Sequence, residues 1–116
     1  DEEYLKLAKE AVDEIMSYTG KPVRVTPTRI RKMLGFGSRF PNEKLVKTRK
    51  FLHEVKEDID NYRIRKIRWA IKEMSKKGLS ITPYKVQLYA GFGGINSEHI
   101  RGLINNELNK KINNNR

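Results

Sequence analysis

The chain has 116 residues, with 25 Lys and Arg against 14 Asp and Glu and a net charge of +11, and it has no cysteine. The missing cysteines exclude disulfides, thiolate metal sites and cysteine nucleophiles, and they are compatible with a reducing cytoplasm. No apolar run approaches the roughly 20 residues that span a membrane, and no signal peptide is visible. The excess of bases favours a polyanion as partner, and nucleic acid fits this better than a membrane surface.

The charge is unevenly distributed along the chain. Residues 1–20 carry a net charge of −4, residues 21–56 carry +9, and residues 57–78 and 79–116 carry +3 each. A basic middle therefore follows an acidic start. Because the chain begins with Asp rather than Met, we expect it to be a fragment of a longer protein.

The first predicted element is an amphipathic helix over residues 2–19, which Gly20 and Pro22 end. Its expected apolar stripe is Leu5, Ala8, Val12, Ile15 and Met16.

A short helix is predicted over residues 27–34, with Thr26 as its cap and Pro27 in its first turn. Its expected buried side is Ile30, Met33 and Leu34. A tight turn, Gly35-Phe36-Gly37, follows, in which the phenylalanine plugs the core. A third helix is expected to start between Ser38 and Asn42, with Pro41 near its first turn, and to run to about Glu57.

The second half repeats the pattern of long, short and long helices. A fourth helix runs from Ile59 or Asp60 to Lys77, with an apolar stripe of Ile64, Ile67, Ile71 and Met74, and Gly78 closes it. Thr82 and Pro83 then open a short helix whose expected buried residues are Val86, Leu88 and Ala90. After the turn at residues 91–94, a sixth helix starts near Asn96 or Ser97, buries Ile100, Leu103, Ile104 and Leu108, and frays at its end.

An internal repeat underlies this pattern. Residues 23–38 read VRVTPTRIRKMLGFGS and residues 79–94 read LSITPYKVQLYAGFGG, at an offset of 56 residues. Five positions are identical, namely Thr26/Thr82, Pro27/Pro83, Gly35/Gly91, Phe36/Phe92 and Gly37/Gly93. Each copy resembles the second helix and turn of a helix-turn-helix. We predict an all-α fold of two tandem three-helix helix-turn-helix units, residues 1–57 and 58–116, packed together.

Candidate DNA contacts follow from this assignment, because the helix after the turn reads bases with its N-terminal residues. In the first unit the candidate base readers are Ser38, Arg39, Asn42, Lys44, Lys47 and Thr48, and the candidate phosphate contacts are Arg29, Arg31 and Lys32. The second unit offers Lys85, Asn96, Ser97, His99 and Arg101, and the basic fourth helix adds Arg65 and Arg68. From the charge along the chain, we expect the first unit to supply most of the affinity. Trp69 is expected to be structural and to seal the interface between the units.

No convergent catalytic set is visible, so we predict no enzymatic activity, no cofactor and no metal site. His53 and His99 are far apart in sequence, and the acids at residues 54–60 are interpreted as helix caps and a solvated face. Neither glycine turn has the Lys-Ser/Thr pair or the preceding strand of a phosphate-binding loop.

Residues 24–35, RVTPTRIRKMLG, and residues 61–91, NYRIRKIRWAIKEMSKKGLSITPYKVQLYAG, resemble the C-terminal region of TnsD-type, TniQ-related target-site selectors of bacterial transposons. The resemblance covers about residues 10–104. It implies a sequence-specific module that binds double-stranded DNA at an attachment site. It further implies a nucleoid-associated cytoplasmic location and help in recruiting an ATP-dependent regulator and a transposase. The family's N-terminal zinc-binding region is not represented, because the chain has no cysteine.

Two other functions fit the residues. A transcriptional regulator would use the same DNA-binding units. A helical protein-interaction adaptor would instead present its basic face to an acidic protein.

Overall fold

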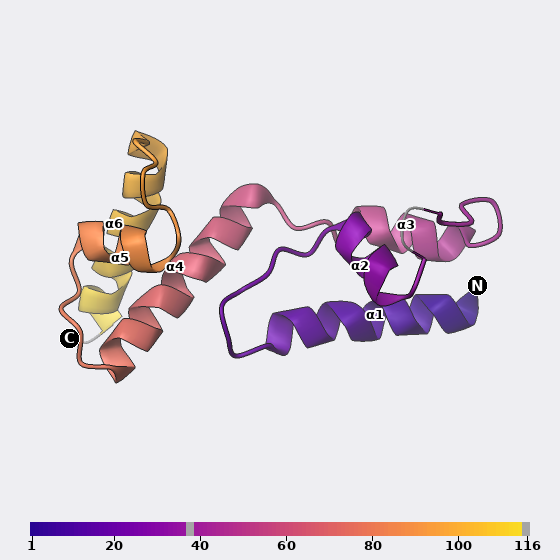
Figure 1. The fold of residues 1–116 in the computed structure, drawn as a ribbon, viewed down its shortest axis with the longest axis horizontal. Coiled ribbons are helices and arrows are strands. Elements are labelled where there is room, and N and C mark those ends of the chain that lie inside the picture. Colours follow the sequence, from indigo (N-terminus) through magenta and orange to yellow (C-terminus); the bar gives the residue numbers. More distant parts are fainter. Residues whose placement is uncertain (37–38, 115–116) are drawn as a thin grey trace. The chain divides into compact units, whose positions relative to one another are not determined.

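The computed structural model describes residues 1–36 and 39–114, and in that part the chain is all-helical, without strands, as predicted (Figure 1). The helices are α1 (Glu2–Ser17), α2 (Pro27–Met33), α3 (Val46–Glu54), α4 (Ile59–Lys76), α5 (Pro83–Tyr89) and α6 (Glu98–Asn114). They form two compact units, Asp1–Ile59 and Asp60–Arg116, each with three helices. None of the described helices is long and apolar enough to cross a membrane.

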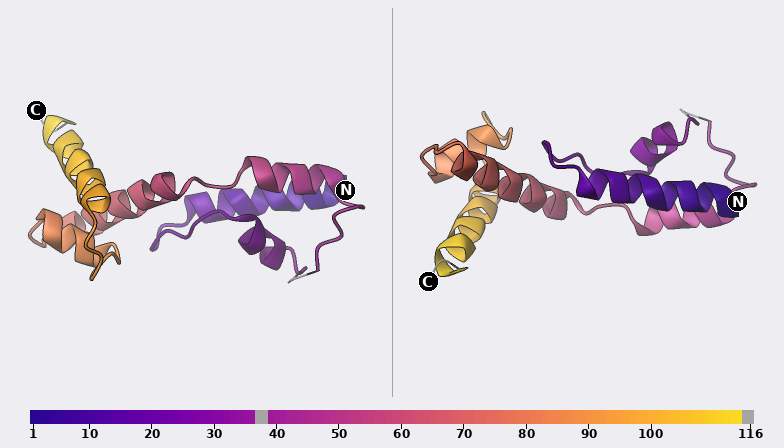
Figure 2. Two further views of the ribbon diagram at one scale, coloured as in Figure 1. Left: turned by 90° about the horizontal axis from the view of Figure 1, so that it is seen from above. Right: turned by 90° about the horizontal axis from the view of Figure 1, so that it is seen from below.

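The first unit is built around α1 and α3, which lie side by side, with α2 packed against both (Figure 2). The buried core residues are Ala8, Ala11, Ile15, Val25, Ile30 and Leu52. Phe36, half-buried in the loop after α2, contacts the rings of Tyr4 and Phe40 at centroid distances of 5.0 and 5.2 Å. Phe36 therefore packs against two aromatic rings of the first unit, one on α1 and one in the loop before α3.

The start of the third helix was predicted wrongly. Instead of beginning between residues 38 and 42, α3 begins at Val46, and the preceding residues form a separate turn in which the Leu45 amide donates to the Pro41 carbonyl at 3.0 Å. The carboxylate of Asp1 caps α3: it accepts hydrogen bonds from the amides of Lys47 at 2.8 Å and Thr48 at 3.2 Å. A helix start fixed by a residue so far away in sequence leaves no local pattern to read.

The second unit has its own core between α4, α5 and α6. Its buried residues are Ile67, Ala70, Ile71, Met74, Val86, Ala90, Phe92, Ile100 and Ile104. The single tryptophan, Trp69, packs on this core and against Tyr89, with ring centroids 5.5 Å apart. Trp69 thus packs against a residue of its own unit.

The repeated motif forms the same local structure in both units. The hydroxyls of Thr26 and Thr82 each accept the amide hydrogen three residues on, at 3.2 Å, and a proline opens each short helix. Gly35 and Gly91 follow with φ of +88° and +89°, a left-handed conformation that side chains disfavour. The predicted caps and the left-handed glycines at the ends of both short helices are therefore confirmed, while Gly37 of the first predicted turn lies outside the residues that the structure describes.

Three residues expected in the core are exposed, and the structure corrects them. Met16, Met33 and Leu88 have relative exposures of 51%, 42% and 48%. In a seven-residue helix only one narrow side faces the core, and the buried Ile30 and Val86 occupy it at equivalent positions of the repeat. Met33 and Leu88 flank that side and stay in solvent. In α1, the buried residues 8, 11 and 15 set a stripe that leaves residue 16 outside.

Candidate functional site

The outward face of α3 is an exposed basic helix surface of the first unit. Leu52 packs into the core, whereas the opposite side exposes Val46, Arg49, Lys50 and His53. In the part of the chain that the structure describes, neither Arg49 nor Lys50 forms an ion pair. Sequence reasoning missed these residues, although their spacing of three, four and seven places them on one helix face.

The predicted base readers on this helix are only partly available. Thr48 is fully buried, and its hydroxyl donates to the Asp1 carboxylate at 2.8 Å, so its assignment as a base reader is wrong. Lys47 is exposed and pairs with Glu2 at the start of α1. The hydrogen bond and charge of Lys47 lower the pKa of the Glu2 carboxyl. Both side chains of this pair are largely in solvent, so it is weak and readily exchanged for another partner.

The remaining predicted readers of the first unit do not lie on a helix. Arg39, Asn42 and Lys44 are exposed in the loop between α2 and α3, because α3 starts later than predicted. Ser38 lies outside the residues that the structure describes.

The three predicted phosphate contacts on α2 divide into two exposed residues and one half-buried residue. Arg29 and Lys32 are exposed. Arg31 is half-buried, with its guanidinium 5.1 Å from the centroid of the Phe40 ring. Arg31 therefore holds the loop before α3, and two of the three bases remain available for an anion.

The predicted readers of the second unit are engaged with one another and with the helix starts. The hydroxyl of Ser97 accepts the Ile100 amide hydrogen at 3.3 Å and caps α6. Arg101 donates to the side-chain oxygen of Asn96 at 3.0 Å, and this exposed pair lines an open hollow of about 530 Å³. Lys85 is exposed on α5.

His99 joins α6 to the start of α4. Its Nε2 lies 2.8 Å from a carboxylate oxygen of Asp60, which also accepts from Arg63 at 3.0 Å. The hydrogen bonds from His99 and then Arg63 lower the pKa of Asp60. A histidine predicted to read bases thus bridges two helix starts.

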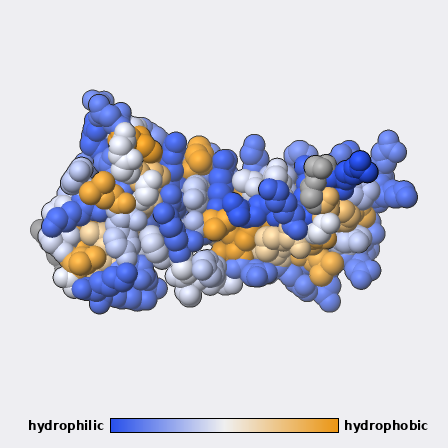
Figure 3. All heavy atoms as spheres, viewed as in Figure 1, coloured by the Kyte–Doolittle hydropathy of each residue, from blue (hydrophilic) through white to orange (hydrophobic). Residues whose placement is uncertain are grey.

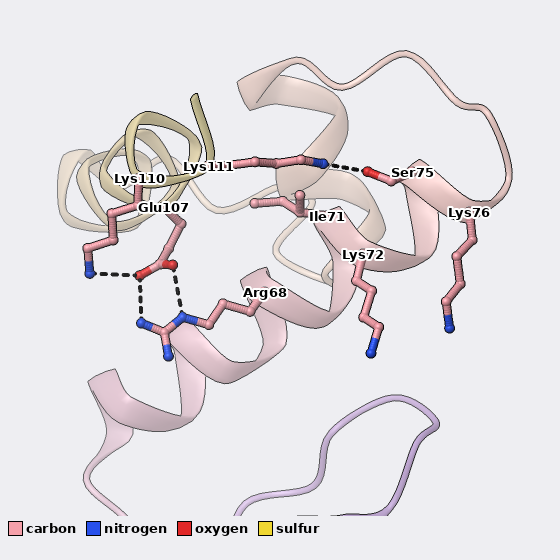
Figure 4. A pocket seen from close by; sticks show the side chains of 8 residues that line it. All are labelled: Arg68, Ile71, Lys72, Ser75, Lys76, Glu107, Lys110 and Lys111. Atoms are coloured by element: carbon pink, nitrogen blue, oxygen red, sulfur yellow. Dashed lines mark hydrogen bonds and ion pairs between the residues drawn. The ribbon is translucent and has the colours of Figure 1, made fainter. Parts of the chain in front are cut away.

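A cationic groove lies between α4 and α6 in the second unit (Figure 4). It has a volume of about 550 Å³, and its lining residues are Arg68, Ile71, Lys72, Ser75, Lys76, Glu107, Lys110 and Lys111. Sequence reasoning had assigned only Arg68 of this set. It missed the groove because α4 and α6 are well separated along the chain.

One buried carboxylate organises the groove. Glu107, only 7% exposed, accepts hydrogen bonds from Arg68 at 2.9 and 3.3 Å and from Lys110 at 3.4 Å. Burial acts to raise the pKa of Glu107, but the hydrogen bonds and charges of Arg68 and Lys110 outweigh it and lower that pKa. The hydrogen bond that Arg68 donates to the same carboxylate raises the pKa of Arg68. Arg68 is thus engaged within the groove and is not a free phosphate contact.

Two further bases of α4, Arg65 and Lys66, lie close to aromatic rings. Arg65 is half-buried, 6.0 Å from the centroid of the Tyr62 ring. Lys66 is buried, with its Nζ 4.6 Å from the centroid of the Phe92 ring. These two bases contribute to packing as well as to charge.

The distribution of charge changes once the chain is divided into its folded units. Asp1–Ile59 holds 13 bases and 10 acids, a net +3, whereas Asp60–Arg116 holds 12 bases and 4 acids, a net +8. The acids of α1 belong to the same unit as the basic residues 21–56, and they offset them. The visible face in Figure 3 is mostly hydrophilic over both units, with small apolar patches. The larger electrostatic attraction for a polyanion therefore belongs to the second unit.

No cluster of three or more His, Cys, Asp or Glu residues that could hold a metal ion occurs among the described residues. The fold and these surfaces define an all-helical protein of two small units with exposed basic faces. No family model, no curated protein and no solved structure matches the chain.

Proposed function

We propose that this protein binds double-stranded DNA. The observation that carries the proposal is the outward face of α3, where Arg49 and Lys50 are exposed on a helix fixed from behind by the buried Thr48 and Leu52. Arg and Lys side chains pair with guanine edges and with phosphates, and a rigid helix presents them at fixed spacing.

In this proposal the second unit attracts DNA by its charge and makes a second contact with it. Its net charge of +8 favours a polyanion, and its exposed Lys85 is suited to a phosphate. Arg101 and Asn96 hold each other in solvent, ready to exchange that hydrogen bond for one to a base. Two contacts on one chain raise the affinity by effective concentration.

The finer function that we propose is selection of a transposon target site. The resemblance to TnsD-type selectors supports it, through the RIRKIRWAI segment of α4 and the helix starts and turns that follow. In this function the DNA site is an attachment site in a bacterial nucleoid. An ATP-dependent regulator and a transposase then join through the rest of the protein.

Fluorescence anisotropy with a labelled random-sequence duplex at two salt concentrations tests the proposal. We expect binding at low salt that weakens steeply as salt rises. The double variant R49A/K50A should bind at least about tenfold more weakly, with a shallower salt dependence.

The matched control removes two other exposed bases of the same unit, in the double variant K21A/K56A. It should stay within about threefold of the wild type, because these bases lie outside α3. Absence of binding by the wild type at low salt would refute DNA binding. Equal losses in both double variants would refute the α3 face. Selection of bound sequences from a random duplex pool then tests sequence specificity.

A further inference from the structure

The groove between α4 and α6 has a chemistry that differs from that of the α3 face. Five cationic side chains surround it, against one carboxylate that two of them already neutralise. Its lining is mainly carbon, contributed by Ile71 and by the methylene stems of the surrounding bases. We propose that this groove is a docking site for an acidic amphipathic helix of a partner protein, independent of DNA binding.

The spacing of the bases on α4 matches a helix. Arg68, Lys72 and Lys76 follow one another every four residues, about 6 Å apart along the axis. A partner helix lying alongside α4, with glutamates at the same interval, presents one carboxylate to each base. Figure 4 shows Lys72 and Lys76 projecting from α4. Lys76 pairs with Glu73 on the same helix at 3.7 Å, a partly exposed pair that a partner carboxylate can replace.

The opposite wall comes from α6. Lys110 and Lys111 project from it, and Lys111 donates to the Ser75 hydroxyl on α4. The bonds from Lys111 to Ser75 and from Arg68 to Glu107 join the two walls, so a partner helix lies over the groove, with its apolar side on the carbon-rich lining and cations on both flanks. This is the helix-in-groove mode of recognition, in which the charges along both sides of the groove determine which partner helix binds.

Duplex DNA fits the groove less well than a helix does. The apolar lining of the groove has no favourable contact to make with a phosphate backbone, whereas it can pack against the apolar side of a helix. The groove also lies away from the residues of α6 that we propose to meet DNA. Lys110 lies nine positions after Arg101, about 14 Å along the helix.

Glu107 has a positioning role in this site. Its buried carboxylate holds Arg68 and Lys110 at the groove by hydrogen bonds of 2.9 and 3.4 Å. Lys72 and Lys76 stay exposed at the rim. A partner therefore finds part of the cationic wall already ordered, which reduces the entropy lost on binding.

The test uses the full chain and a labelled synthetic peptide of about 18 residues, long enough to form a helix. The peptide carries a leucine stripe, with glutamates four residues apart on both flanks. Two control peptides replace every glutamate by glutamine or scramble the order at constant composition. Anisotropy at low salt should show binding of the acidic amphipathic peptide and at least about tenfold weaker binding of both controls.

The deciding variant is K72E/K76E, which reverses two rim charges and leaves the bonds of Glu107 in place. It should bind the acidic peptide at least about tenfold more weakly. Because it lowers the net charge of the second unit from +8 to +4, it should also weaken DNA binding, but by less than R49A/K50A does. R49A/K50A should show the reverse, weak DNA binding and unchanged peptide binding. Circular dichroism establishes that both variants keep their helices.

Three outcomes would overturn the proposal. The first is that the wild type fails to bind the acidic peptide, and the second is that the glutamine or scrambled control binds equally well. The third is that duplex DNA displaces the peptide while K72E/K76E loses more DNA affinity than R49A/K50A does, which would assign the groove to nucleic acid. Because peptide binding is measured without DNA, failure of this proposal and failure of DNA binding are separate results.

Discussion

Replacing Glu107 by Gln tests whether the buried carboxylate stabilises the second unit. Gln keeps the shape of the side chain but loses its charge, and so it loses the charge-assisted bonds from Arg68 and Lys110. Such bonds contribute about 1.5–3 kcal/mol. Because the Arg68 and Lys110 side chains are about 60% exposed and water takes over part of their bonding, the low end applies. We expect E107Q to lower the free energy of unfolding by about 1–2 kcal/mol, equivalent to roughly 5–15 °C in Tm for a unit of this size.

Trp69 provides a readout specific to this unit. It is the only tryptophan of the chain and packs on the core of the second unit, so its fluorescence during urea unfolding follows that unit alone. The control is E98Q, which removes an exposed carboxylate in the first turn of the same helix. It should change the free energy of unfolding by about 0.5 kcal/mol or less.

The pH dependence gives a second check. The folded-state pKa of Glu107 lies below its ordinary value of 4.5, so its stabilising contribution is complete above that value and is lost as pH falls through the folded-state pKa. The difference in unfolding free energy between wild type and E107Q should therefore be complete at neutral pH and should disappear as the pH falls through the lowered pKa of Glu107. Equal unfolding midpoints at neutral pH, or a difference that persists unchanged in acid, would refute this reasoning.

Two further predictions concern the helix starts of the second unit. T82A removes the cap of α5 and should lower the free energy of unfolding by about 1 kcal/mol, measured by Trp69 fluorescence. The control S80A changes an exposed residue two positions away and should have little effect. If S80A lost as much stability as T82A, the capping role of Thr82 would be contradicted. H99A removes the hydrogen bond to His99, which contributes most to lowering the pKa of Asp60, and it should raise that pKa in an NMR titration of the side-chain carboxyl. H53A, which removes an exposed histidine of the other unit, should leave the Asp60 pKa unchanged, and an equal response to both variants would count against the pairing.

The elements that depend on local signals were predictable from the sequence. Thr26 and Thr82 cap their helices through residues three positions away, and the glycines that end the short helices take the left-handed backbone that such a position requires. The same signals placed α4 and α5 to within a residue or two. In these cases the interaction that fixes the structure lies within the pattern itself.

The features that were missed depend on residues distant in sequence. Asp1 caps α3, although 46 positions separate it from Lys47 in the sequence, and α3 begins later than its local sequence predicts. The same carboxylate accepts a hydrogen bond from the buried Thr48 hydroxyl. Glu107 meets Arg68 across the groove between α4 and α6. The larger charge of the second unit emerged only when the acids of α1 were counted with the basic stretch they fold against. Composition along the chain could not show which charges end up in one folded unit.

The two separate cores bear on how a duplicated segment can diverge. Each cluster of buried residues lies within one unit, so a mutation in one core requires no matching change in the other. The five positions that stayed identical at the offset of 56 are the cap, the proline and the glycine turn with its phenylalanine, and the caps and the left-handed glycines among them are costly for a unit to lose. Exposed charged positions such as Arg49 and Lys50 carry no such constraint, so two copies of one motif can keep the same architecture and differ in surface chemistry.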